Sequence, residues 1–67
     1  MKSFNTALKL LLLDLKICYS YDAGNGNKGQ VWFEPRLNKI YCKLDCGCLD
    51  SLTIRQAKAL IKKAESL

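Results

Sequence analysis

The sequence predicts an α+β domain of two layers, a small antiparallel sheet with a helix at each end of the chain. Two observations predict this class. Apolar residues recur at helical spacing near both termini, and two central runs alternate between apolar and polar residues. We expect the order helix, strand, strand, short strand, helix. A chain of 67 residues has room for one hydrophobic core, so we treat residues 1–67 as a single domain.

The first element is expected to be a helix over residues 3–20, with Ser3 or Asn5 as its N-cap. Its apolar stripe consists of Phe4, Ala7, Leu8, Leu11, Leu12, Leu15, Cys18 and Tyr19. A second apolar sector consists of Leu10, Leu13, Ile17 and Tyr21. A helix on one face of a small sheet does not need this second sector. It therefore predicts contact with the C-terminal helix or with another chain, a second copy included.

The middle of the chain predicts a loop followed by a hairpin. Residues 22–29 are rich in Gly and Asn and are expected to be a mobile loop. Residues 30–45 alternate as two strands around a turn at residues 35–38. One register pairs apolar residues on the inner face and aromatic or oppositely charged residues on the outer face. The pairs are Phe33–Ile40, Val31–Cys42, Trp32–Tyr41 and Glu34–Lys39.

The last part of the chain predicts a short third strand over residues 47–50 and a helix over residues 54–66. Thr53 and Gln56 have the spacing of a capping box, in which each side chain bonds to the backbone of the other residue. The expected core of the whole domain is Phe4, Leu8, Leu11, Leu15, Val31, Phe33, Ile40, Leu44, Ile54, Leu60 and Ile61.

Composition argues against several classes of protein. The chain has no His, which removes the commonest general base, so we expect no enzymatic activity. The longest uninterrupted apolar run near the N-terminus, Leu10 to Leu13, is far shorter than a membrane span. No small-residue cleavage site follows it, and we therefore expect a cytoplasmic protein without membrane contact.

The four cysteines are the residues that could bind a metal ion or react as thiols. Cys18, Cys42, Cys46 and Cys48 could together supply the four thiolates of a zinc site, although their spacing is unusual. The alternative that we favour is free thiols, because Cys18 and Cys42 are expected at core-facing positions where Cys acts as a small hydrophobic residue. An oxidised pair is the third possibility. We therefore expect no cofactor. Cys46 and Cys48 flank Gly47 in a turn and are the pair expected to react.

Basic and aromatic residues define the candidate binding sites. The chain carries a net charge of +5. Trp32 and Tyr41 are expected to project together from the hairpin, among Lys39, Lys43 and Arg36. Aromatic rings within a basic surround can stack on the bases of single-stranded nucleic acid. Arg55, Lys58 and Lys62 form a second basic stripe on the last helix. If the first helix or a partner covers the sheet face that carries Trp32 and Tyr41, these two residues belong to the core instead.

The predicted element order, together with the segment Thr53-Ile54-Arg55-Gln56-Ala57-Lys58, resembles the double-stranded-RNA-binding domain. The segment is similar to the start of that family's second helix, and the resemblance implies that Arg55 and Lys58 contact phosphates. Ile54 stands where the family has a basic residue, and the family's Gly-Pro-x-His loop has no counterpart here.

From these features we expect a small, basic, non-enzymatic binding module. The function we favour is that of an inhibitor or adaptor, of the kind made by phages and mobile elements, acting on a protein or nucleoprotein partner. The second apolar sector and the Trp32–Tyr41 pair favour this function, since aromatic residues often anchor protein interfaces. The alternative is direct binding of nucleic acid through the Trp/Tyr/Lys face and the basic helix. Homodimerisation through the first helix is a further expectation.

Overall fold

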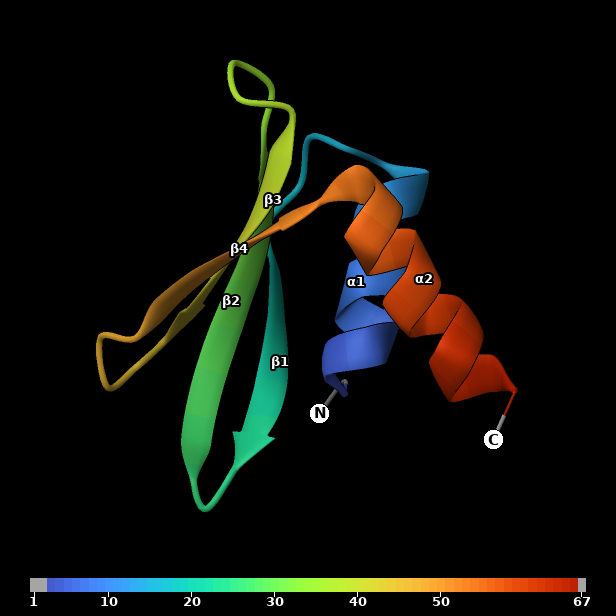
Figure 1. Ribbon diagram of the computed structural model, residues 1–67. Helices are drawn as coiled ribbons and strands as arrows, with labels where there is room; N and C mark the ends of the chain where they lie inside the picture. Colours follow the sequence, from blue (N-terminus) through green and yellow to red (C-terminus); the bar gives the residue numbers. More distant parts are fainter. Residues whose placement is uncertain (1–2, 67) are drawn as a thin grey trace.

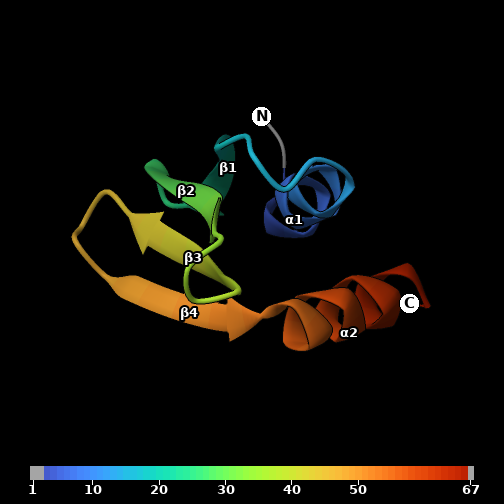
Figure 2. The same cartoon turned by 90° about the horizontal axis from the view of Figure 1, so that it is seen from above.

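The computed structural model, which describes residues 3–66, has a four-stranded antiparallel sheet with two helices packed on one side of it (Figure 1). The elements are α1 (Phe4–Leu13), β1 (Tyr19–Gly24), β2 (Asn27–Glu34), β3 (Lys39–Leu44), β4 (Leu49–Thr53) and α2 (Ile54–Glu65). The strands follow one another across the sheet in the order β1-β2-β3-β4. The structure thus confirms the α+β class, with a helix at each end and one strand more than the sequence predicted. Seen from above, both helices lie on the same side of the twisted sheet (Figure 2).

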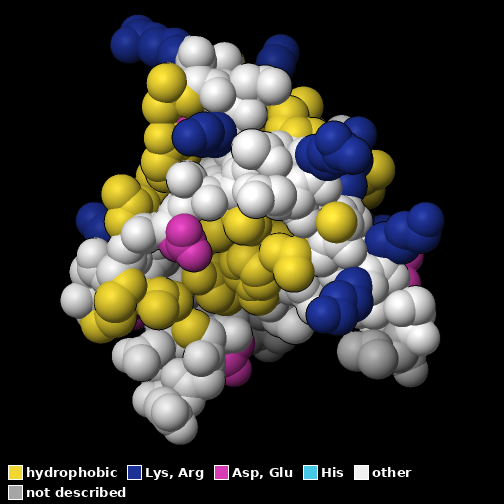
Figure 3. All heavy atoms as spheres, in the orientation of Figure 1, with side chains coloured by type: hydrophobic (Ala, Val, Ile, Leu, Met, Phe, Trp, Pro, Cys, Tyr) yellow, Lys and Arg dark blue, Asp and Glu magenta, His cyan; other side chains and the backbone are white. Residues whose placement is uncertain are grey.

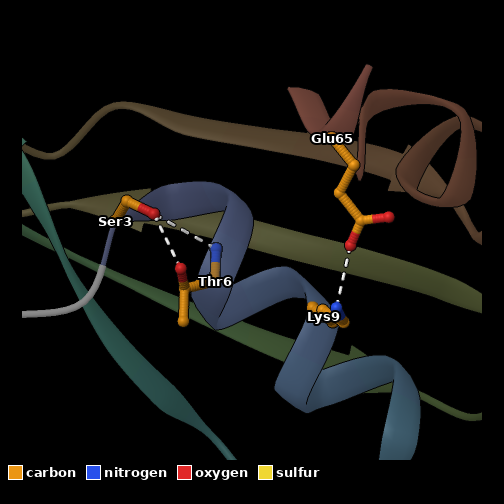
Figure 4. Close-up of polar contacts among 4 residues, drawn as sticks. All are labelled: Ser3, Thr6, Lys9 and Glu65. Atoms are coloured by element: carbon orange, nitrogen blue, oxygen red, sulfur yellow. Dashed lines mark hydrogen bonds and ion pairs between the residues drawn. The ribbon is translucent and has the colours of Figure 1, made fainter. Parts of the chain in front are cut away.

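Helix α1 begins as predicted but ends early. The Ser3 side chain caps it by accepting a hydrogen bond from the Thr6 backbone N–H at 3.3 Å (Figure 4). The helix stops at Leu13, so the prediction of a helix over residues 3–20 is wrong for residues 14–20. The chain turns at residues 14–16 and enters β1 at Tyr19. Pairing with β2 therefore overrides a helical apolar pattern that continues beyond the real end of the helix.

Residues 22–29 are not a mobile loop but the end of one strand and the start of the next. A two-residue turn at Asn25 and Gly26 joins β1 to β2, and both residues have positive φ, 52° and 78°. Positive φ at both central positions is typical of a type I′ turn, whose twist matches that of antiparallel strands. The Asn25-Gly26 dipeptide is the local signal for this hairpin, whereas the high content of Gly and Asn alone predicts only a loop.

The hairpin of β2 and β3 has the predicted register throughout. The structure pairs Phe33 with Ile40, Val31 with Cys42, Trp32 with Tyr41 and Glu34 with Lys39. Val31 and Ile40 are fully buried against the helices, and Cys42 is nearly so. The alternation of strand side chains then sends Trp32 and Tyr41 to the opposite face of the sheet.

Strand β4 begins two residues later than predicted and forms one edge of the sheet. Side chains bond to part of the backbone of this edge strand. The Ser51 N–H donates to Asp50 Oδ1 at 2.8 Å, and the Thr53 N–H donates to Gln56 Oε1 at 3.0 Å. The second bond belongs to the predicted capping box of α2, which the structure confirms. Because side chains satisfy two of its N–H groups, β4 offers few free donors to a strand of another chain.

The core lies between the helix pair and the inner face of the sheet. Leu8, Leu11, Val31 and Ile40 are its largest fully buried side chains, and all four were predicted. Five other predicted core residues pack against this centre with partial exposure, namely Phe4, Phe33, Leu44, Ile54 and Ile61. Leu15 follows the end of α1 and is half-buried, whereas Leu60 is 39% exposed, so its core assignment is wrong.

Tyr21 is the core residue that the sequence placed wrongly. It was expected on a second sector of the first helix, but it is a β1 residue with 5% of its surface exposed. Its ring contacts Phe4 edge-to-face, with centroids 5.0 Å apart, and crosses over Gly29 of β2. A side chain at position 29 would overlap the Tyr21 ring, so this close approach requires glycine.

Among residues 3–66, one ion pair joins the exposed surfaces of the two helices. Lys9 Nζ of α1 lies 2.8 Å from Glu65 Oε1 of α2 (Figure 4). Both side chains are more than half exposed, so we expect the pair to add little stability. Within residues 3–66, no helix is long and apolar enough to cross a membrane.

Candidate binding surface on the open face of the sheet

The face of the sheet that carries Trp32 and Tyr41 has no helix over it in the described structure (Figure 2). We call it the open face. The two helices cover the other face because Val31, Ile40 and Cys42 form the apolar side of the central strands. The possibility that the first helix covers Trp32 and Tyr41 is therefore excluded for residues 3–66.

Trp32 and Tyr41 form a stacked aromatic pair at the centre of the open face. They lie opposite each other on β2 and β3, with ring centroids 5.8 Å apart and ring planes inclined by 18°. Both side chains are half-buried, so part of each ring remains in contact with solvent. Offset stacking of this kind restrains both rings, which reduces the side-chain entropy that a partner would have to remove on binding.

Two exposed leucines lie beside the aromatic pair. Leu37, in the turn between β2 and β3, is 56% exposed, and Leu49, at the start of β4, is 60% exposed. Together with Trp32 and Tyr41 they line a shallow depression of about 440 Å³, whose other lining residues are Glu34 and Arg36. We call Trp32, Tyr41, Leu37 and Leu49 the open-face patch. Neither leucine stands out in the sequence, because an isolated Leu in a turn or at a strand end carries no periodic signal.

Charged residues surround the open-face patch. Lys39 and Lys43 flank Tyr41 along β3 at alternate positions, which places all three side chains on the same face. Glu34 lies opposite Lys39 in the register, but its carboxylate accepts a hydrogen bond from the Arg36 backbone N–H at 3.2 Å. Among the described residues, Lys39, Lys43 and Arg36 form no ion pair, so their charges are available to a partner.

The second predicted basic stripe belongs to a different part of the molecule. Arg55, Lys58 and Lys62 are all exposed, and they lie on α2 in the helix layer. No residue of α2 lines the depression beside Trp32. The structure therefore splits the predicted binding residues into an open-face group and a helix group.

The predicted second apolar sector does not exist as a helix face. Leu10 is half-buried on α1, and Tyr21 is in the core. Leu13 and Ile17, at and just beyond the end of α1, are 78% and 45% exposed. These two side chains remain available for contact with a second copy of the chain, and homodimerisation remains a prediction.

An apolar cleft opens between the sheet and the helices, where hydrophobic side chains gather at the centre of the molecule (Figure 3). Its volume is about 450 Å³. Its lining residues are Phe4, Tyr21, Cys42, Leu44, Cys48, Leu49, Asp50, Leu52 and Leu60. We call it the inner cleft. It exists because α2 leaves β4 at an angle and does not close over the end of the sheet where β3 and β4 turn (Figure 1).

The four cysteines occupy three environments. Cys18 follows the end of α1 and is exposed before β1, so its predicted core-facing position is wrong, whereas Cys42 is buried on the inner face as predicted. Cys46 and Cys48 are exposed at the β3–β4 turn. Residues 3–66 contain no group of three or more Cys, Asp, Glu or His side chains placed to hold a metal ion. The structure thus does not bring the four thiols together as a zinc site would require.

The pKa values of three thiols depart from the ordinary value. Burial raises the pKa of Cys42 to about 11, and the nearby Asp50 carboxylate adds to the rise. The Cys48 backbone amide and then the Cys48 thiol lower the pKa of Cys46. The same thiol contact raises the pKa of Cys48. Cys46 is therefore the member of the pair that ionises first.

Comparison with protein-family models, with curated protein sequences and with solved structures finds no match to this chain. The resemblance to the double-stranded-RNA-binding domain depended in part on a predicted order with three strands, but the structure has four. The resemblance thus rests on the start of α2 alone.

Proposed function

We propose that this protein is a non-enzymatic binding module that docks a protein partner, or the protein part of a nucleoprotein, on the open-face patch. The observation that carries the proposal is the placement of two exposed leucines beside a stacked Trp–Tyr pair. Inhibition of the partner, or its bridging to another protein, is the activity that we propose for a domain of this size. This proposal rests on an analogy of size with the small inhibitors and adaptors of phages and mobile elements.

The chemistry of the patch favours a protein partner over nucleic acid. Protein interfaces have an apolar centre with aromatic anchors and a charged rim, which is the arrangement around Trp32 and Tyr41. Leu37 and Leu49 add aliphatic surface, which stacks poorly on bases and makes no bond to phosphates. A partner with apolar side chains and acidic residues around them would match this surface.

Direct binding of nucleic acid is the second candidate, and a separate observation favours it. Lys39 and Lys43 lie on the same face as the aromatic pair, and Arg36 is in the adjoining turn. Bases could stack on the exposed part of a ring while these side chains contact phosphates. In this case binding would weaken steeply with salt, because each phosphate contact releases a counterion.

A photo-crosslinking experiment tests the proposed surface. A photoreactive amino acid replaces Leu37 in one variant and Lys58, on the exposed side of α2, in a matched control. We expect position 37 to give discrete protein adducts in a cell lysate. Addition of Leu49→Ser should remove them, while position 58 should not give the same adducts. Adducts that survive Leu49→Ser, or that appear equally from position 58, would contradict docking on the open face.

Fluorescence of Trp32, the only Trp of the chain, separates the two candidates. Titration with single-stranded DNA, duplex DNA and duplex RNA at low and high salt should leave the emission unchanged if the partner is a protein. Quenching that salt abolishes, and that Lys39→Glu with Lys43→Glu removes, would instead establish nucleic acid as the ligand.

A further inference from the structure

The turn between β3 and β4 places two thiols side by side. Cys46 Sγ and Cys48 Sγ are 3.4 Å apart, and both side chains are exposed. Gly47 between them has φ of 96°, a conformation that other residues rarely adopt. The docking of a partner on the open-face patch does not require this pair of thiols.

The backbone of the turn is held by its own hydrogen bonds. The Leu44 N–H donates to the Cys48 carbonyl oxygen at 3.0 Å, and the Gly47 N–H donates to the Leu44 carbonyl oxygen at 2.9 Å. A disulfide bond is about 2.05 Å long, so the two sulfurs would have to approach by little more than one ångström. Rotation of the two exposed side chains can supply much of this movement without breaking the hairpin.

We propose that Cys46 and Cys48 form a thiol–disulfide exchange site that reacts with small disulfides of the glutathione type. In the first step the Cys46 thiolate attacks one sulfur of the small disulfide. The bond between the two small thiols breaks, a mixed disulfide forms on Cys46, and one small thiolate leaves and takes up a proton.

In the second step Cys48 loses its proton and attacks Cys46 Sγ. The mixed disulfide breaks, the Cys46–Cys48 bond forms, and the second small thiolate leaves and takes up the proton. The pair of thiols is thus oxidised by two electrons, and the small disulfide is reduced to two thiols. The ring closed across a single residue is small, and a strained disulfide is easily reduced, so the reaction should be reversible.

The environments of the four thiols assign these roles. The lowered pKa of Cys46 increases the fraction of the attacking thiolate, and the neighbouring Cys48 is placed to resolve the mixed disulfide. Cys42 is buried and has a raised pKa, so small disulfides should not modify it in the folded protein. Cys18 is exposed but lies in another part of the fold, before β1.

The experiment equilibrates the folded protein with reduced and oxidised glutathione and stops the exchange with acid, which protonates the thiolates. The remaining thiols are then alkylated with excess reagent in denaturant at neutral pH, and tryptic peptides are mapped by mass. Trypsin places the cysteines in three separate peptides. Cys18 lies in residues 17–28, Cys42 in residues 40–43, and Cys46 with Cys48 in residues 44–55. We expect peptide 44–55 to lose two hydrogens and to carry no alkyl group as oxidised glutathione increases. The other two peptides report on single thiols and serve as internal controls.

Two variants and one denatured sample test the assigned roles. Cys48→Ser should retain glutathione on Cys46, whereas Cys46→Ser should react more slowly. In urea the fraction of closed ring at the same glutathione ratio should fall several-fold, because the turn no longer holds the thiols together. Recovery of peptide 44–55 with both thiols alkylated, or with glutathione retained on the wild-type protein, would overturn the proposal. An equal ring fraction in urea would overturn the role of the turn.

Discussion

The contact between Tyr21 and Gly29 provides a quantitative test of how the sheet is packed. Replacement of Gly29 by Ala adds a methyl group where the Tyr21 ring lies, with ring atoms Cζ, Cε1 and Oη as the nearest neighbours. Gly29 is in a strand paired on both sides, and the Tyr21 side chain is 5% exposed, so neither can move freely. The ring must therefore leave part of its site in the core.

Two kinds of core substitution set lower and upper limits on the expected loss in free energy of unfolding. Overpacking a core by one methyl group typically costs about 1–3 kcal/mol. Complete loss of a buried aromatic side chain typically costs about 3–5 kcal/mol, which sets an upper limit. We therefore expect Gly29→Ala to lower the free energy of unfolding by about 2–3 kcal/mol. This loss is a large share of the total free energy of unfolding, which is about 3–10 kcal/mol for a domain of this size.

A double-mutant cycle measures the contact directly. Urea unfolding, followed by Trp32 fluorescence and circular dichroism, would be compared for Gly29→Ala, Tyr21→Val and the double variant. In the Tyr21→Val background the added methyl should have little effect, or should stabilise by up to about 1 kcal/mol through the unfolded chain. The coupling between the two positions should thus be about 2–4 kcal/mol. An equal loss in both backgrounds would refute the explanation that Tyr21 requires glycine at position 29.

Three further predictions concern the stability of the fold. Because burial raises the pKa of Cys42 from 9.0 to about 11, the unfolded thiol ionises first as pH rises. Stability should fall between pH 9 and 11 by up to about 2 kcal/mol more in the wild type than in Cys42→Ala, measured by urea unfolding at each pH. Thr53→Ala should lower stability by about 1 kcal/mol in thermal or urea unfolding, since it removes the hydrogen bond to the Gln56 N–H, and an unchanged midpoint would contradict the capping role. Lys9→Met should change stability by less than about 0.5 kcal/mol, because the ion pair with Glu65 is exposed, and a larger loss would show that the pair holds the helices together.

Local patterns in the sequence were sufficient for the hairpin of β2 and β3 and for the start of α2, but not for the bounds of β4. The register of β2 and β3 followed from four neighbouring pairs, because one register alone satisfied both the apolar and the charged pairings. The start of α2 followed from Thr53 and Gln56, because a capping box is a contact within one turn of the chain. In both cases the interacting residues are close in sequence or directly opposed across a short turn.

The first half of the chain depended on contacts that are distant in sequence. Residues 14–21 continue a helical apolar pattern, yet the alternation of Tyr19 and Tyr21 with polar neighbours also fits a strand. The choice was made by pairing with β2 and by the fit of Tyr21 over Gly29, and neither can be read from a helical period. The Asn25-Gly26 turn was the one local signal that pointed to the strand.

For the candidate site, the sequence by itself determined that Trp32 and Tyr41 lie together opposite the apolar face of the hairpin, since strand side chains alternate between faces. The tertiary structure alone decided that both helices pack on the same side, and that this leaves the aromatic pair uncovered beside Leu37 and Leu49. It also separated the basic residues of α2 from those of the hairpin. The physical reason is that alternation is a property of each strand, whereas the covering of a face depends on where elements distant in sequence find apolar surface to bury.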